Sequence, residues 1–245
     1  MPSFSPEEKA RTLKLIRSRL DHDLRSNLNV ILGYCSMLKE ELSSRQVTPG
    51  MIEDLGFIEA AGKDLLQMND RIGDLVALQE GEWKPANTGL DLDRIVDAIA
   101  HKLSARFPGL NIELNGSANL DHGDSAATTR LLFSIMDALC RATSVVPGLS
   151  IELSASGDDA TVDVRCIMDA APEPEQRKLV RILEGLQETV SELTSIQDFD
   201  NYYCSTMREL TGAEVHTDVK HLACRVRFRD IIDHAEATDS DNPAG

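Results

Sequence analysis

The feature that most constrains this chain of 245 residues is a long apolar stripe near its N-terminus. Apolar residues recur there at alternating spacings of three and four, which is the period of one face of an α-helix. The positions are Leu13, Ile16, Leu20, Leu24, Leu28, Ile31, Cys35 and Leu38. A stripe of this length predicts one amphipathic helix that must bury its apolar face against another element.

A second stripe of the same kind follows a turn-rich break at residues 43–50. Thr48 is a candidate N-cap, and Pro49 suits the first helical position. The apolar residues after this break are Met51, Leu55, Ile58, Gly62, Leu65, Met68, Ile72, Leu75 and Val76. Two long helices joined by a short loop predict an antiparallel hairpin. Because the apolar seam runs the whole length of the hairpin, we expect it to pair with a second copy as a homodimeric four-helix bundle. The alternative is that the seam packs on the chain's own second domain.

The rest of the chain has a different pattern, which begins after a polar connector at residues 78–87. Short strand-like runs alternate there with helical runs, which predicts an α/β sandwich with a mixed sheet. The expected helices are 92–107, 126–142, 175–193 and 200–210, and the expected strands are 110–114, 118–120, 149–155, 160–168, 213–217 and 222–228. The predicted fold class is therefore α+β, with a helical hairpin at 1–80, an α/β sandwich domain at 88–232 and a disordered acidic tail at 233–245.

Charge and composition restrict the possible partners and the compartment. A net charge of −16 argues against nucleic acid or an anionic membrane as the partner. The chain shows no apolar run long enough to span a bilayer and no signal peptide, which predicts a cytoplasmic protein. The five cysteines show no Cys-x-x-Cys spacing, so we interpret them as buried reduced thiols and expect no metal site.

His22 is the candidate catalytic residue of the first helix. It lies two residues from both Leu20 and Leu24, and two residues turn the chain roughly 200° around a helix, so His22 should point away from the apolar stripe into water. Asp23 is adjacent in sequence, and the expected surface neighbours of the imidazole are Arg19, Arg25, Ser26 and Asn29. An isolated surface histidine is usually only solvated, so the surrounding sequence decides between the two interpretations.

The segment His-Asp-Leu-Arg-Ser-Asn-Leu-Asn-Val-Ile-Leu-Gly-Tyr resembles the phospho-acceptor helix of two-component sensor histidine kinases. The family pattern is His, an adjacent acid, a Thr or similar polar residue one turn later, Pro, and an apolar run into Gly-Tyr. By this resemblance His22 is the phosphorylated histidine, Asp23 is the acid and Ser26 stands for the Thr. Asn27 departs from the pattern where the family commonly has proline, so this helix should be straighter.

The element order of the second region resembles the ATP-binding domain of the same family, without its nucleotide-binding residues. That domain holds ATP and Mg²⁺ with Asn side chains and with glycine loops. Ser134 and Ala138 occupy the Asn positions, and Asp169 matches the adenine-contacting acid. The glycine positions correspond to Ala171, Glu173 and the segment 198–203, where acids and aromatic residues stand instead. We therefore expect repulsion of a triphosphate and no cofactor bound by this chain.

An intact acceptor helix beside a degenerate nucleotide site predicts a histidine phosphotransferase. A response regulator's receiver domain would pass its phosphoryl group to the histidine, which would pass it to a second regulator, and the receiver would supply Mg²⁺. The predicted catalytic residues are His22, Asp23 and Ser26, with Arg19, Arg25 and Asn29 forming the docking face. The alternatives are a non-catalytic pseudo-kinase adaptor that binds a regulator and, third, an ATP-dependent histidine kinase.

Overall fold

The computed structural model describes residues 24–26, 28–40, 42, 49–142, 148–167, 172–187 and 195–230. These residues fall into two compact units, of which one ends at Trp83 and the other begins at Lys84. The division lies inside the polar connector that separates the two sequence patterns. The expected tail at 233–245 lies outside the described residues.

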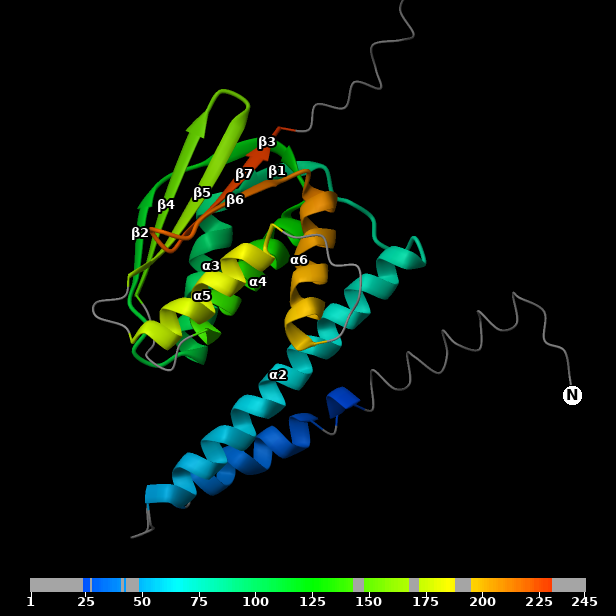
Figure 1. Cartoon of the computed structure of the whole chain (residues 1–245). Coiled ribbons are helices and arrows are strands. Elements are labelled where there is room, and N and C mark those ends of the chain that lie inside the picture. The colour runs from blue at the N-terminus through cyan, green and yellow to red at the C-terminus, as the bar shows by residue number, and fades with distance from the viewer. Residues whose placement is uncertain are drawn as a thin grey trace, which may run out of the picture. The chain divides into compact units, whose positions relative to one another are not determined.

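The first unit is an antiparallel pair of helices (Figure 1). The described residues before position 43 are helical, and α2 spans Pro49–Gln79. Arg25 Nη2 donates to Asp70 Oδ1 at 2.8 Å, and Lys39 Nζ donates to Glu59 Oε2 at 2.5 Å. Arg25 precedes Lys39 in the first helix, whereas its partner Asp70 follows Glu59 in α2. The two helices therefore run antiparallel, as predicted for a hairpin.

The hairpin buries few of its own apolar residues. Leu28 and Cys35 are buried, and Gly62 allows close packing, since a Cβ at that position would lie 2.9 Å from Cδ2 of Leu32. The large apolar side chains that remain exposed in this unit are Leu24, Val30, Ile31, Tyr34, Met37, Leu38, Met51, Ile52, Phe57, Ile58, Leu65 and Ile72. One chain by itself therefore covers only part of the stripe that the sequence shows.

The second unit is built on a mixed five-stranded sheet in the order β2-β4-β5-β7-β6. Strand β2 pairs in parallel with β4, and the other neighbours are antiparallel. The strands are β2 (Ile112–Gly116), β4 (Gly148–Ser156), β5 (Asp159–Ile167), β6 (Glu214–Asp218) and β7 (Ala223–Arg229). A separate antiparallel pair joins β1 (Thr88–Asp91) to β3 (Asn119–Gly123). Strand β1 was not among the expected strands, because its four residues carry no alternating pattern and become a strand through pairing with β3.

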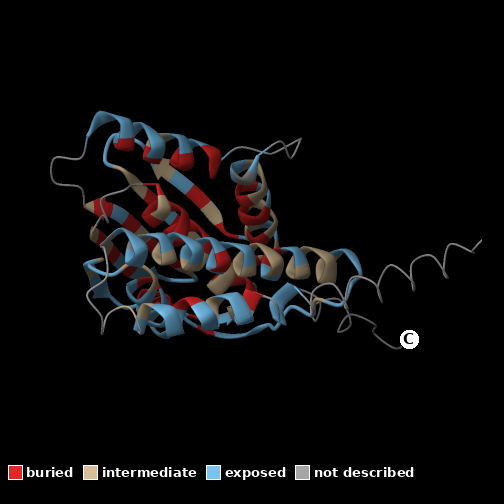
Figure 2. Cartoon of the chain, turned by 90° about the horizontal axis from the view of Figure 1, so that it is seen from below, coloured by how far each residue is buried: buried red, intermediate tan, exposed pale blue. Residues whose placement is uncertain are grey.

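Four helices lie on one side of the five-stranded sheet (Figure 1). They are α3 (Leu92–Arg106), α4 (Ser125–Arg141), α5 (Glu173–Gly185) and α6 (Ile196–Thr211). Eleven of the 17 residues of α4 are buried, so this helix lies at the centre of the core. Figure 2 shows the buried residues gathered in this second unit, whereas the hairpin is mostly exposed or intermediate.

Two helices, α5 and α6, differ from the sequence-based expectation by more than one residue at a boundary. Helix α6 begins at Ile196, four residues before the expected start, because the Ser195 side chain caps it by accepting from the backbone N–H of Asp198 at 3.1 Å. Helix α5 begins two residues before its expected start and ends at Gly185 instead of continuing to residue 193. A Cβ on Gly185 would lie 2.4 Å from Nδ2 of Asn201, so this end of α5 packs closely against α6.

The observed elements confirm the α+β class and the order of a helical hairpin followed by an α/β domain. The pairing of two hairpins into a bundle stays a prediction. All five cysteines are buried and none forms a disulfide, as the spacing indicated. Among the described residues there is no helix with the length and apolar content that crossing a membrane requires.

Candidate functional site

On the side away from its buried residues, the described part of the first helix carries two polar residues and, further along, the exposed apolar residues Val30 and Met37. Ser26 and Asn29 are exposed, whereas Leu28 and Cys35 point into the hairpin. The other predicted site residues of this helix, which are His22, Asp23 and Arg19, lie outside the described residues. Ser26 is two residues from Leu28, which places it roughly 200° around the helix.

Arg25 reaches across the hairpin to α2. Its guanidinium pairs with Asp70 at 2.8 Å, and both side chains are about half exposed to solvent. An exposed pair of this kind contributes little to stability, in the range of about 0–1 kcal/mol. Arg25, which the sequence predicted as part of the docking face, is thus paired with an acid of α2.

The positions that correspond to the nucleotide site lie in different surroundings. Ser134 and Ala138 are both buried in α4. Glu173 opens α5 and pairs with Arg177 at 2.8 Å, whereas Asp169 and Ala171 lie outside the described residues. Among the described residues no cluster of three or more His, Cys, Asp or Glu side chains is placed to hold a metal ion.

A buried ion-pair network connects three helices of the second unit. Asp137 of α4 is fully buried, and its carboxylate faces Arg106 Nη1 of α3 at 3.3 Å and Arg141 Nε at 2.9 Å. Arg141 also donates from Nη2 to Asp200 of α6 at 2.8 Å. Sequence reasoning missed this network, although the spacing of four between Asp137 and Arg141 is a readable helical pair.

The network corrects one electrostatic expectation. The acids of the segment 198–203 were expected to meet a triphosphate with bare negative charge. Asp200 is instead 7% exposed and held by Arg141, so its charge is already balanced. The partner lies 59 residues earlier in the chain, which is why the local sequence gave no sign of it.

A cavity of about 370 Å³ opens beside this network, between α4, α5 and α6. Three cationic side chains, one from α4 and two from α5, line it together with a single carboxylate from α6. The lining residues are Ala138, Arg141, Ala142, Lys178, Arg181, Ile182, Gln197 and Asp200. Its place at the end of α4 puts it next to Ala138, one of the two positions where the resembling family carries asparagine.

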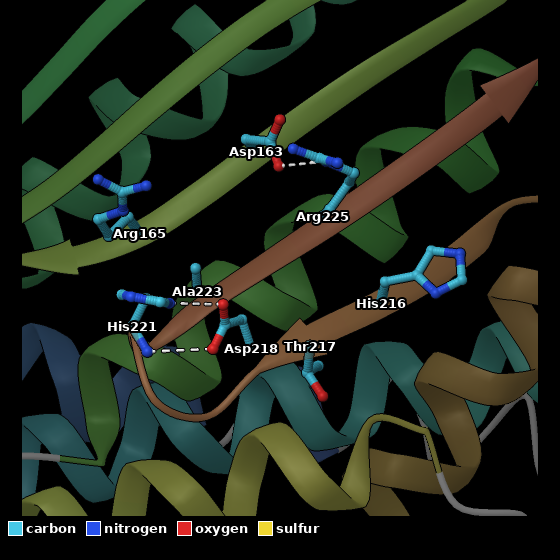
Figure 3. A pocket seen from close by; sticks show the side chains of 8 residues that line it. All are labelled: Asp163, Arg165, His216, Thr217, Asp218, His221, Ala223 and Arg225. Atoms are coloured by element: carbon cyan, nitrogen blue, oxygen red, sulfur yellow. Dashed lines mark hydrogen bonds and ion pairs between the residues drawn. The ribbon is translucent and has the colours of Figure 1, made fainter.

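A second cavity of about 270 Å³ lies on the opposite, solvent-facing side of the sheet (Figure 3). Here cations and acids alternate: Asp163 of β5 accepts from Arg225 of β7 at 2.7 Å, and Asp218 accepts from His221 Nδ1 at 2.6 Å. The hydrogen bond from the His221 side chain lowers the pKa of the Asp218 carboxyl. Each acid named here has a basic partner, which is typical of an exposed sheet face.

The chain matches no family model and no curated protein sequence. Among solved structures, full-length ShkA in complex with AMPPNP aligns with 87% of this chain and 45% of its own length, at 17% identity and a TM-score of 0.51. The Acinetobacter baumannii histidine kinase AdeS aligns over 86% of this chain and 98% of its own, at 11% identity and a TM-score of 0.49. A bacterial phosphotransferase aligns over 92% and 98%, at 14% identity and a TM-score of 0.43. At such identities the likeness concerns the fold alone, which is a helical hairpin followed by an α/β domain that resembles the histidine-kinase ATP-binding domain.

Proposed function

We propose that this chain is a histidine phosphotransferase that relays a phosphoryl group between response-regulator aspartates through His22. The observation that carries the proposal is that Ser26 and Asn29 of the first helix are exposed on the side away from the hairpin core. His22 precedes Ser26 by four residues, so the helical period predicts that the imidazole shares this face. A receiver domain approaching from solvent would meet that face first.

The chemistry requires little from this chain beyond a positioned nucleophile. A neutral imidazole nitrogen of His22 attacks the phosphorus of the receiver's aspartyl phosphate, the P–N bond forms, the P–O bond breaks and the aspartate carboxylate leaves. Asp23 would stabilise the positive charge that develops on the ring. The receiver would supply Mg²⁺, and transfer to a second regulator would reverse the same bond changes.

The exposed apolar residues of the hairpin support its pairing with a second copy. Seven of the twelve recur every seven residues, as Leu24, Ile31 and Leu38 on the first helix and as Met51, Ile58, Leu65 and Ile72 on α2. A seven-residue repeat of apolar side chains is the pattern of a helix-bundle seam. A two-fold axis brings the same surface of two copies together, so a homodimer would bury the apolar seam of each copy against the other.

The cavity between α4, α5 and α6 supports transfer from a receiver instead of from ATP. Mg²⁺ is bound through oxygen ligands, commonly carboxylates. The carboxylate of the lining residues, Asp200, is held by Arg141, and Ala138 offers only a methyl group. These two residues do not offer Mg²⁺ the oxygen ligands it prefers, which favours transfer from a receiver over transfer from ATP.

The test is phosphoryl transfer from a purified receiver domain that has been charged with labelled acetyl phosphate. We expect one acid-labile, base-stable label on this chain, and His22→Ala should abolish it. His101→Ala is the matched control, because His101 is an exposed histidine of α3 in the other unit. A receiver that binds without transferring label would replace this proposal with the adaptor function.

A further inference from the structure

The cavity on the solvent-facing side of the sheet exists because a small residue stands between larger ones. The strand register places Ala223 of β7 between Arg165 of β5 and Asp218 of β6. The methyl group of Ala223 fills little space there, which leaves a hollow of about 270 Å³ (Figure 3). This volume is just below the range of roughly 300–1,000 Å³ for small-molecule sites, so it suits a small ligand.

One wall of this cavity is fixed by hydrogen bonds that use both oxygens of Asp218. Its Oδ1 accepts from the backbone N–H groups of Lys220 and His221 at 3.0 and 3.2 Å. Its Oδ2 accepts from the ring of His221 at 2.6 Å. The carboxylate of Asp218 is therefore committed to the turn between β6 and β7, and it holds the His221 ring at the edge of the cavity.

Arg165 and Asp163 each keep a polar group that has no partner in the described part of the chain. Arg165 is exposed and forms no hydrogen bond or ion pair there. Asp163 accepts from Arg225 Nε through Oδ1 at 2.7 Å, which leaves its Oδ2 available. The two residues are two positions apart on β5, so they project from the same face with their Cα atoms about 7 Å apart. An uncommitted guanidinium thus lies beside an uncommitted carboxylate oxygen.

The charges of the cavity lining sum to zero when its two histidines are neutral. Arg165 and Arg225 contribute two positive charges, and Asp163 and Asp218 contribute two negative charges. A purely anionic or purely cationic ligand would be attracted by one of the two uncommitted groups and repelled by the other. A zwitterion satisfies both groups, because its carboxylate can accept from the arginine fork while its ammonium group donates to the aspartate.

We propose that this cavity binds a free α-amino acid as its zwitterion. The α-carboxylate would accept from the guanidinium of Arg165, and the α-ammonium group would donate to Oδ2 of Asp163. The side chain of the ligand would extend toward Thr217 and His216, which favours small or polar side chains. The site involves neither His22 nor the cavity between α4, α5 and α6, so the proposal goes beyond the phosphotransfer function.

The test is a ligand-observed NMR titration of the full chain with glycine, L-serine and L-glutamine at neutral pH. We expect saturable binding of at least one of them. Arg165→Gln and Asp163→Asn should each weaken it by at least about ten-fold, equivalent to about 1.4 kcal/mol, since each removes the partner of one ligand charge. Arg229→Gln is the matched control and should leave the affinity unchanged. Arg229 is an exposed arginine of the same sheet that lies outside the cavity lining and pairs with Glu214 at 2.7 Å.

Two analogues of serine test whether both charges of the ligand contribute to binding. Ethanolamine lacks the carboxylate and 3-hydroxypropanoate lacks the ammonium group, so each should bind at least about ten-fold more weakly than the tightest of the three amino acids. This comparison uses the unmodified chain, so it holds even if a variant fails to fold. His22→Ala should bind as the unmodified chain does, which separates this site from the phosphotransfer function.

Three results would overturn the proposal. They are absence of saturable binding by all three amino acids, equal affinity for either analogue, and equal weakening by Arg229→Gln. Circular dichroism verifies the fold of each variant.

Discussion

The two units of this protein differ in how far they bury their own apolar residues. Helix α2 has 31 residues, yet among its described side chains only Gly62 and Arg71 are buried, whereas α4 buries eleven of 17 residues. The α/β unit builds a core from its own strands and helices. The hairpin leaves a seam of apolar residues exposed every seven positions, which a single chain does not cover. An amphipathic pattern thus indicates which residues need burial but not whether the covering surface belongs to the same molecule.

The largest expected effect comes from placing charge in the open seam. Ile31→Glu combined with Leu65→Glu should convert a dimer into a monomer and reduce the helical signal of the hairpin, because carboxylates would be buried without partners. Light scattering after size-exclusion chromatography measures the mass. Met37→Glu is the control, since Met37 is exposed and lies about 120° around the helix from Ile31. A dimer that survives the double change would show that the seam is not the interface.

A smaller effect is expected inside the α/β unit, where charge is already buried and paired. Asp137→Ala removes the carboxylate between Arg106 and Arg141 and leaves them without it, so we expect a loss of about 3–5 kcal/mol in the free energy of unfolding. Asp163→Ala breaks an exposed pair with Arg225 and should cost less than about 1 kcal/mol. Urea unfolding measures both values. Equal costs would mean that burial of the network contributes nothing.

A further effect is absent at neutral pH and appears only under alkaline conditions. Burial raises the pKa of the Cys140, Cys166 and Cys224 thiols to about 12. In the unfolded chain a thiol ionises near ~8.5, so above that pH the unfolded state releases protons that the folded state keeps. The free energy of unfolding should therefore fall as pH rises from about 9 toward 12, by roughly 1 kcal/mol per pH unit for each thiol.

Urea titrations at several pH values measure this slope, and one variant isolates the thiol contribution. Cys224→Ala should show a shallower decline than the unmodified chain, because one buried thiol no longer titrates. An identical slope in both proteins would assign the alkaline sensitivity to other groups.

The strands were predictable from the sequence wherever alternation was strong. In β5, Ala160, Val162 and Val164 point inward between polar residues, and the expected strand 160–168 matches the observed one closely. Strand β1 was not predictable, because four residues without alternation form a strand only through β3. Serine is a common N-cap residue, so the start of α6 after Ser195 was predictable from the sequence. The expected start was later because the segment 198–203 was assigned to a loop of the resembling family.

The two candidate sites also differ in how far the sequence predicts them. The exposure of Ser26 and Asn29 follows from helical periodicity, so both positions were predictable from the local sequence. The cavity of the α/β unit depends on Arg141, Lys178 and Asp200, which are far apart in the chain and meet only through the packing of three helices. Periodicity places a residue on a face of its own helix, but it does not say which distant residue lies opposite.

We propose that the hairpin accepts a phosphoryl group from a receiver domain and that the α/β unit does not supply one from ATP. The most direct measurement offers the same preparation two labelled donors, a phosphorylated receiver domain and ATP with Mg²⁺, and quantifies the phosphohistidine formed from each. We predict label at His22 from the receiver and none from ATP. Label from ATP at His22, or its absence with every receiver offered, would contradict the account.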